Sequence, residues 1–159
     1  MGIGNINNFK SNIVEYSTPI KLFQPLMDEF NFEIDVCASS ENYKCDTYFT
    51  KEQDGLKQEW VGNCWMNPPF GKQMLTWVKK IRDESKKHYG TKVCLIPVRS
   101  NTKWWKDVVI DAEIRFIIGE VNFNDEPRGL WLPMCLLIFG DKANVGHFSI
   151  IDYKELKLQ

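Results

Sequence analysis

The segment CWMNPPFG, residues 64–71, restricts the possible folds of this chain more than any other stretch. Its apolar start is followed by an amide, two adjacent prolines and an aromatic ring. The prolines lack backbone N–H groups, so they cannot continue a hydrogen-bonded ladder in the middle of a sheet. Residues 64–66 are therefore predicted to form a short strand that ends in a rigid turn at Asn67.

The remaining apolar segments alternate between strand and helix patterns, which predicts a three-layer α/β domain with a largely parallel sheet. The last two strands are separated by the turn-like GDKANVG and are predicted to form an antiparallel hairpin at the edge. Residues 37–61 read as a polar loop, and the Asn-rich residues 1–12 as a mobile end. The predicted strands are residues 32–36, 64–66, 92–98, 114–119, 135–140 and 147–152.

Three helices are predicted from periodic apolar residues. The first starts with Thr18 as N-cap and Pro19 as its first residue, and Pro25 should kink it or shift its start. The second carries a basic face, and the third covers residues 103–112. The apolar faces of the first two helices contain Leu22, Phe23, Leu26, Met27 and Phe30, and Met74, Trp77, Val78 and Ile81.

The 159 residues suit one domain, residues 1–159, with a sizeable core. No apolar run reaches the roughly 20 residues of a membrane helix. The first dozen residues lack the features of a signal peptide, which predicts an intracellular protein. The five cysteines show no paired spacing and the two histidines lie far apart. Buried or half-buried free thiols are therefore expected, and neither a disulfide framework nor a metal site.

The charge of the chain is unevenly distributed. The net charge is -1, yet residues 71–106 contain ten Lys or Arg and two acids, leaving ten bases and 19 acids elsewhere. Such asymmetry is typical of a surface that faces a polyanion, and a solvated helix face is the alternative. Within this segment, Lys72 and the residues that follow the strand end at Val98 are predicted to contact phosphates: Arg99, Lys103 and Lys106.

The turn at residues 67–70 suits one kind of ligand, an exocyclic NH2 group. The side-chain oxygen of Asn67 and the carbonyl of Pro68 form two fixed acceptors, because the prolines offer no local N–H. Adenine N6 is a poor nucleophile because its lone pair is delocalised into the ring. Holding both amino hydrogens localises that lone pair toward an electrophile by positioning and electrostatics. Phe70 offers a face for the base, which must leave a duplex to reach it.

Asn67-Pro68-Pro69-Phe70 resembles the (D/N)-P-P-(Y/F/W) motif of S-adenosylmethionine-dependent amino-methyltransferases. The order of YSTPIKLFQPLMDEF, FEIDVCASSEN, YFTKEQDGL, WMNPPFG and LIPVRSNTKWW resembles the phage-type DNA N-6-adenine-methyltransferase family over most of residues 16–140. The resemblance implies a Rossmann-like methyltransferase fold, S-adenosyl-L-methionine as cofactor and adenine N6 in DNA as methyl acceptor. It also implies a phage- or prophage-encoded protein in the cytoplasm of a bacterial host.

The resemblance further implies roles for individual residues. Thr18 and Pro19 match a motif that touches the methionine carboxylate of the cofactor, and Asp35-Val36-Cys37-Ala38 matches the motif whose aspartate engages the methionine moiety. Asn42 and Asp54 fall where the family contacts ribose or adenine. Asn67, Pro68, Pro69 and Phe70 match the target-base motif.

The sequence also departs from the family pattern. CASSEN contains no glycine after the first strand, and Gly119-Glu120 replaces a frequent Gly-Arg pair. A separate target-recognition domain is absent, so loops must supply the specificity.

Two other functions are compatible with these motifs. RNA adenines and glutamine side chains also present an NH2 group to Asn-Pro-Pro-aromatic pockets, although the basic segment favours nucleic acid over protein. A DNA-binding relative without catalysis is the other alternative, and the presence of both Asn67 and Asp35 argues against it. The sequence does not give the recognition site or the oligomeric state.

Overall fold

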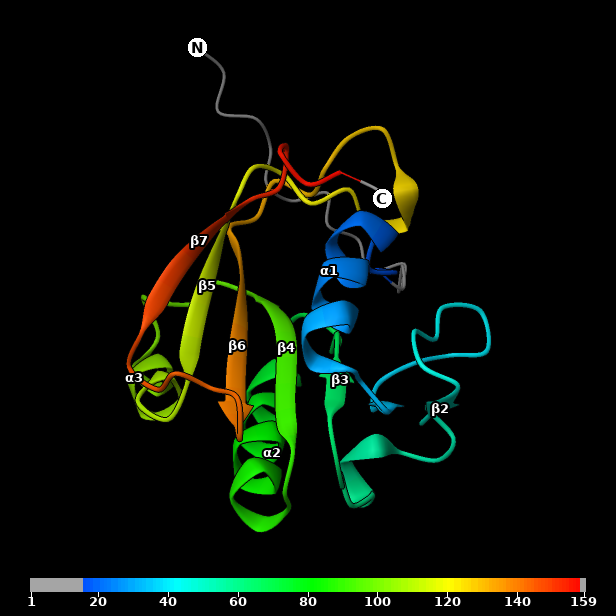
Figure 1. Cartoon of the computed structure of the whole chain (residues 1–159), viewed down its shortest axis with the longest axis vertical. Helices are drawn as coiled ribbons and strands as arrows, with labels where there is room; N and C mark the ends of the chain where they lie inside the picture. The colour runs from blue at the N-terminus through cyan, green and yellow to red at the C-terminus, as the bar shows by residue number, and fades with distance from the viewer. Residues whose placement is uncertain (1–15, 158–159) are drawn as a thin grey trace.

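A computed structural model describes residues 16–157 (Figure 1). The predicted mobile end, residues 1–12, lies outside the described residues. Within residues 16–157, seven strands form one sheet in the order β2-β1-β3-β4-β6-β5-β7. They are β1 (Ile34–Asp35), β2 (Thr47–Tyr48), β3 (Cys64–Met66), β4 (Thr91–Pro97), β5 (Glu113–Ile118), β6 (Met134–Gly140) and β7 (Phe148–Asp152).

The sheet has the predicted mixed, mostly parallel character. Only the two pairings of β6, with β4 and with β5, are antiparallel among the strands of residues 16–157. The helices are α1 (Ile20–Phe30), α2 (Met74–Lys87) and α3 (Lys103–Val109), and the 3₁₀ turns are η2 (Gly55–Lys57) and η3 (Phe123–Asp125). The fold class is therefore confirmed as α/β, consistent with a Rossmann-like methyltransferase.

The antiparallel pair has other members than predicted. β6 is inserted between β4 and β5, while β7 pairs in parallel with β5, so the last two strands do not form a hairpin. The backbone N–H of Asn144 donates to Glu113 Oε2 at 2.8 Å, and that of Gly146 donates to the Ala112 carbonyl at 3.1 Å. These bonds hold the connection under the start of β5, so the chain emerges on the far side of that strand.

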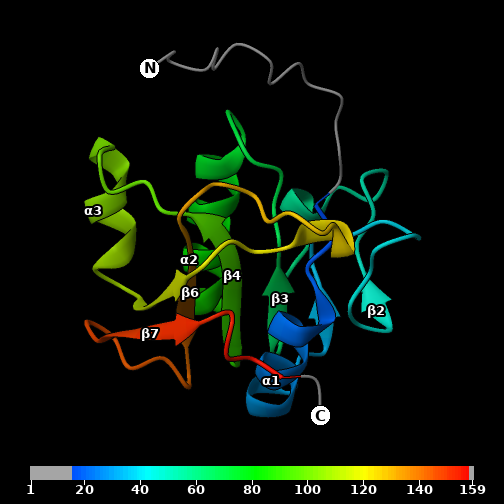
Figure 2. The same cartoon turned by 90° about the horizontal axis from the view of Figure 1, so that it is seen from above.

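The two faces of the sheet are covered by different helices, as Figure 2 shows. Side chains alternate along β4, so Val93 and Leu95 pack in the cluster of α1, whereas Cys94 and Ile96 pack in the cluster of α2 and α3. The result is the predicted three-layer arrangement. No helix within residues 16–157 has the length and apolar character that a membrane crossing requires.

Helix α1 begins one residue later than predicted. Its N-cap is Pro19, with extended backbone angles of φ -65° and ψ 141°, and no side chain caps the helix. Thr18 lies one residue before this N-cap, and its hydroxyl oxygen accepts a hydrogen bond from Asn67 instead. Pro25 lies inside the helix, which continues to Phe30. The helix therefore does not start after this proline.

The cysteines are free thiols, as predicted. Cys45, Cys64, Cys94 and Cys135 are buried and Cys37 is half-buried. Burial raises the pKa of Cys45, Cys64 and Cys135 to about 12. Within residues 16–157, no cluster of three His, Cys, Asp or Glu side chains could hold a metal ion.

Candidate active site

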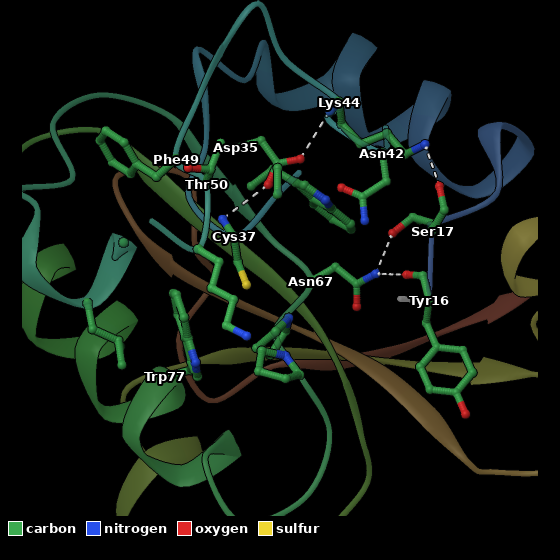
Figure 3. Close-up of a pocket in the computed structure, with 18 of the residues that line it drawn as sticks. Tyr16, Ser17, Asp35, Cys37, Asn42, Lys44, Phe49, Thr50, Asn67 and Trp77 are labelled. Atoms are coloured by element: carbon green, nitrogen blue, oxygen red, sulfur yellow. Dashed lines mark hydrogen bonds between the residues drawn. The ribbon is translucent and has the colours of Figure 1, made fainter. Parts of the chain in front are cut away.

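A cavity of about 740 Å³ lies at the carboxyl ends of β1 and β3, a size typical of small-molecule sites (Figure 3). Ligands of open parallel sheets bind at this edge. The cavity joins the segment before α1, the turns after β1 and β2, the end of β3 and the start of α2. Its walls comprise Tyr16, Ser17, Thr18, Asp35, Cys37, Ala38, Asn42, Lys44, Phe49, Thr50, Lys51, Asp54, Gly55, Leu56, Trp65, Asn67, Pro68, Pro69, Phe70, Gln73 and Trp77.

The cavity brings together nearly all residues that the sequence proposed for the cofactor and the base. Ten of those eleven residues line it, and the exception is Pro19. Pro19 instead faces a smaller cavity of about 240 Å³, together with Lys21 and Tyr153. The ten residues that meet are Thr18, Asp35, Cys37, Ala38, Asn42, Asp54, Asn67, Pro68, Pro69 and Phe70.

Asn67 is held by both hydrogens of its side-chain amide. Nδ2 donates to the Tyr16 carbonyl and, at 3.1 Å, to Thr18 Oγ1. A carbonyl oxygen only accepts, so the end of the amide that faces Tyr16 must be the nitrogen. Figure 3 shows this nitrogen directed at Tyr16 and the oxygen pointing away from it. The orientation of Oδ1 is therefore fixed by contacts that reach about 50 residues back along the chain.

Three buried polar atoms of the cavity walls have no hydrogen-bond partner among the described residues. They are Asn67 Oδ1 and the indole nitrogens of Trp65 and Trp77. The fourth such atom, His88 Nε2, is elsewhere and lies 3.5 Å from a Glu84 carboxylate oxygen. Unpaired buried groups are rare because each costs desolvation free energy. Three of the four such atoms thus belong to residues that line one cavity, and Asn67 Oδ1 is the acceptor among them.

Phe70 belongs to an aromatic group at the cavity wall. Its ring stacks on Tyr16, with centroids 5.3 Å apart and an interplanar angle of 17°. Phe123 contacts both rings edge-on, at 5.9 Å from Phe70 and 5.5 Å from Tyr16. One side of Phe70 is thus occupied by Tyr16, so Tyr16 and Phe70 together form the aromatic surface of this wall.

Asp35 is a buried carboxylate at the end of β1, with an exposed fraction of 3%. Its oxygens accept from the backbone N–H groups of Cys37 at 3.3 Å and Lys44 at 3.0 Å. Burial nevertheless raises the pKa of the Asp35 carboxyl to about 6, against the lowering effect of these bonds and of the Lys44 charge. The side chain of Lys44 donates to Ser17 Oγ at 3.2 Å, and burial lowers its pKa. Asp35 and Lys44 therefore place a carboxyl group and an amine at the same cavity, whose walls also include Lys51 and Asp54.

The turn that contains Asn42 replaces the missing glycine loop after β1. Asn42 Oδ1 accepts from the backbone N–H of Ser39 at 2.8 Å, and the backbone N–H of Tyr43 donates to the Ser39 carbonyl at 3.2 Å. A side-chain amide thus closes the turn. The oxygen of Asn42 is engaged in this bond.

Asp54 and Gly55 form the turn at the opposite wall. Asp54 adopts left-handed backbone angles, φ 53° and ψ 85°, and its carboxylate accepts from Leu56 N–H and pairs with Lys57 at 3.2 Å. A Cβ atom at Gly55 would lie 2.1 Å from the Val36 carbonyl oxygen, so only glycine permits this approach to β1. Strained backbone of this kind is common at binding sites.

The four predicted phosphate contacts lie outside the cavity walls. Arg99 follows β4, the neighbour of β3, and therefore emerges at the same edge of the sheet as Asn67. Lys72 follows the double-proline turn, and Lys103 and Lys106 belong to α3. Within residues 16–157, none of the four takes part in a salt bridge.

Five of the ten Lys and Arg side chains in residues 71–106 are either buried or paired with a carboxylate. Lys92 is fully buried, and its ammonium donates to the carbonyls of Gly62, His88 and Tyr89. Four further basic side chains of the segment are paired with carboxylates. The charge count therefore overstated the surface available to a polyanion. These pairs are Lys80–Glu84, Arg82–Asp83, Lys86–Asp111 and Lys87–Glu59.

Sequence reasoning missed several residues of the cavity. Lys44 lies in a segment that reads as polar loop, and Trp77 occupies an apolar position of α2 that reads as core. Trp65 lies in β3 and is fully buried, yet it also lines the cavity. The sequence did contain a signal for Lys44, because it is the only Lys or Arg in residues 36–50, shortly after Asp35. The other residues missed are Tyr16, Ser17, Phe49, Thr50, Lys51, Gly55, Leu56 and Gln73.

Comparison with known proteins reveals sequence relatives of this chain. The sequence model of the family described as DNA N-6-adenine-methyltransferase (Dam) matches residues 7–143. The DNA N-6-adenine-methyltransferase of Haemophilus phage HP1 (strain HP1c1) is 32% identical over an alignment of 165 positions. This alignment covers 95% of this chain and 94% of that protein.

A second relative is more distant and longer. The DNA N-6-adenine-methyltransferase of Escherichia phage T1 is 28% identical over 111 residues, which cover 67% of this chain and 46% of that protein. The matched region therefore spans about half the length of the phage T1 protein. The family match includes the whole cavity described above.

Proposed function

Because the chain belongs to the DNA N-6-adenine-methyltransferase family, we propose that it transfers a methyl group from S-adenosyl-L-methionine to N6 of an adenine flipped out of duplex DNA. Adenine N6 in DNA is the acceptor that the family indicates. The cofactor, the flipped base and the roles of single residues are the substance of the proposal. The observation that carries it is the orientation of Asn67, whose oxygen is buried, fixed and unpaired among the described residues.

The proposed chemical step rests on two oxygens that hold one amino group. Asn67 Oδ1 and the carbonyl of the buried Pro68 accept the two hydrogens of adenine N6. Both acceptors draw the nitrogen toward tetrahedral geometry, and the lone pair then points at the methyl donor. The amide of Asn67 needs no reorientation at that moment, because Tyr16 and Thr18 already fix it. Tyr16 and Phe70 provide the aromatic surface against which the purine packs.

The cavity suits S-adenosyl-L-methionine by its charges and aromatic walls. This cofactor supplies an electrophilic methyl group on a positively charged sulfur. The carboxylate of Asp35 complements the cationic part of its methionine moiety, and the ammonium of Lys44 complements the carboxylate. The remaining lining residues of the family motifs surround the rest of the cofactor: Thr18, Cys37, Ala38, Asn42 and Asp54.

In this proposal the domain that holds the cavity also contacts the DNA. Lys72, Arg99, Lys103 and Lys106 contact phosphates at the edge where the cavity opens, and loops of the same edge read the bases. The protein acts in the cytoplasm of a bacterial host, a proposal supported by its relatives from Haemophilus phage HP1 and Escherichia phage T1.

Transfer of a labelled methyl group tests the proposed function. The protein is incubated with S-adenosyl-L-methionine and, separately, with duplex DNA, RNA and a glutamine-containing peptide. We expect label in DNA alone, recovered as N6-methyldeoxyadenosine after digestion to nucleosides and mass analysis. Label in RNA or in the peptide but not in DNA would contradict the proposal, as would a methylated cytosine.

A salt titration tests the phosphate contacts. We expect the affinity for duplex DNA to fall steeply with salt, and Arg99→Ala and Lys103→Ala each to reduce the slope of log K against log salt by about 1. Lys87→Ala is the matched control, because Lys87 lies at the C-terminal end of α2, at the opposite edge of the sheet. Equal slopes for the wild type and both test variants would exclude these residues as phosphate contacts.

A further inference from the structure

Trp131 exposes more of its surface than any other large apolar side chain in the described part of the chain, at 85%. It lies in the loop that joins β5 to β6, residues 119–133. Its neighbours Leu130 and Leu132 pack against the hydrophobic core on the α1 side of the sheet. Side chains alternate along residues 130–132, so the two leucines point toward the core and the indole of Trp131 points into solvent.

The loop around Trp131 is fixed to the body of the protein. Leu130 forms an antiparallel bridge with Val121, and its N–H donates to the Val121 carbonyl at 2.9 Å. Gly129 lies so close to Glu120 that a Cβ atom there would meet the Glu120 Cβ at 2.2 Å. The backbone just before Trp131 is therefore anchored to Glu120 and Val121.

One part of this loop is tied to the rim of the active-site cavity. The backbone N–H of Ser17 donates to Asn124 Oδ1 at 2.7 Å, and the backbone N–H of Asn124 donates to the Ser17 carbonyl at 3.0 Å. The ring of Phe123 contacts the rings of Tyr16 and Phe70. The proposed base pocket and the first half of the loop thus share a wall.

The other end of the loop is tied to the segment that carries Arg99. The backbone N–H of Val98 donates to the Pro133 carbonyl at 2.8 Å. Trp131 therefore belongs to a bridge of chain between the base pocket and a predicted phosphate contact. Figures 1 and 2 show this loop crossing the end of the sheet where the parallel strands finish.

The charges of the loop are compatible with DNA at Trp131. Arg128 is exposed, and within residues 16–157 it takes part in no salt bridge. Of the three acidic residues of the loop, Asp125 and Glu126 line the smaller cavity with Lys21, and Glu120 packs against Gly129. Arg128 is the charged residue nearest to Trp131 in sequence, three positions before it.

We propose that Trp131 stacks on a base of the duplex that becomes unstacked when the target adenine enters the cavity. The inference rests on the proposed base flipping. Removal of a base from a duplex exposes the flat faces of its neighbours and of its former partner, and inserted apolar or aromatic side chains stabilise such gaps. An exposed indole supplies such a face, in a loop that is tied to the pocket rim through Asn124 and to the segment of Arg99 through Pro133. The proposed ligand of Trp131 is therefore a nucleobase of double-stranded DNA.

Two DNA substrates separate stacking from other roles of Trp131. One is a duplex that the wild type methylates, and the other carries an abasic position opposite the target adenine, so that less pairing must be broken. We expect Trp131→Ala to lower kcat/KM about tenfold on the normal duplex and much less on the abasic duplex. Trp131→Phe should retain most of the activity, and cofactor affinity should stay unchanged in both variants.

Tyr89→Ala is the matched control, because Tyr89 is 69% exposed and lies at the opposite edge of the sheet, before β4. It should behave as wild type on both duplexes. Normal activity of Trp131→Ala on the paired duplex, or an equal loss on both duplexes, would overturn the stacking proposal alone. If 2-aminopurine at the target position showed no fluorescence change with the wild-type protein, base flipping itself would fail, and the role of Trp131 with it.

Discussion

Replacing Asn67 by alanine is expected to lower the rate of methyl transfer about 10³-fold, the upper range for removing one preorganised group that acts in the transition state. The affinity for S-adenosyl-L-methionine should remain unchanged. The physical reason is that the lost oxygen contacts only the amino group of the base. Single-turnover transfer and calorimetry of cofactor binding measure the two effects separately.

Asn67→Asp distinguishes the oriented amide from a mere oxygen. An aspartate has no donor for the Tyr16 carbonyl and the Thr18 hydroxyl, and its carboxylate would meet the carbonyl oxygen. We therefore expect this variant to lose activity too, although one oxygen of the original position is kept. Asn101→Ala, in the exposed turn after β4, is the control and should be fully active. Near-normal turnover of Asn67→Ala would contradict the proposal that Asn67 Oδ1 holds the amino group of the base.

Replacing Asp35 by asparagine is expected to weaken cofactor binding about 100-fold at pH 8, because removing one partner of a buried charge pair costs about 2–5 kcal/mol. The change also removes one of the two oxygens that accept from Cys37 and Lys44, so thermal unfolding must be measured alongside. Asp46→Asn is the matched control, since Asp46 is exposed and lies outside the cavity walls. Calorimetry with the cofactor gives the affinities.

The pH dependence of binding identifies the charge of Asp35 as the cause. Burial raises the pKa of this carboxyl to about 6, so in the free protein it gains a proton as the pH falls through 6. A cationic ligand favours the ionised form. Cofactor affinity should therefore decline as the pH falls through this range in wild type and in Asp46→Asn, and stay flat in Asp35→Asn. An affinity of Asp35→Asn equal to wild type at pH 8 would show that the carboxylate does not hold the cofactor.

Central strands could be predicted from sequence because their pattern has one interpretation. β4 and β6 are continuous apolar runs, which is typical of strands buried on both faces, and both were found within one or two residues of their bounds. β2 was missed because its two residues lie in a polar segment and depend on parallel pairing with Ile34 and Asp35. The wrong partner for β7 had a similar cause, since hydrogen bonds to Ala112 and Glu113 decide the path of the connection.

The candidate site was predictable where one short motif carries the geometry. Asn67 and Asp35 each follow or end a strand, and parallel strands place both at one edge of the sheet. What holds them was not predictable, because Tyr16 and Thr18 reach Asn67 across about 50 residues of chain. Charge counting likewise could not tell the half-buried Arg99 from the fully buried Lys92, which differ in their tertiary surroundings.

The most direct measurement is a crystal structure of the protein with S-adenosylhomocysteine and a duplex that contains the target adenine. We expect the adenine outside the helix, with N6 about 3 Å from both Asn67 Oδ1 and the Pro68 carbonyl, and the cofactor product beside Asp35. An adenine still stacked in the duplex, or Asn67 Oδ1 bonded to a donor of the protein itself, would contradict the account.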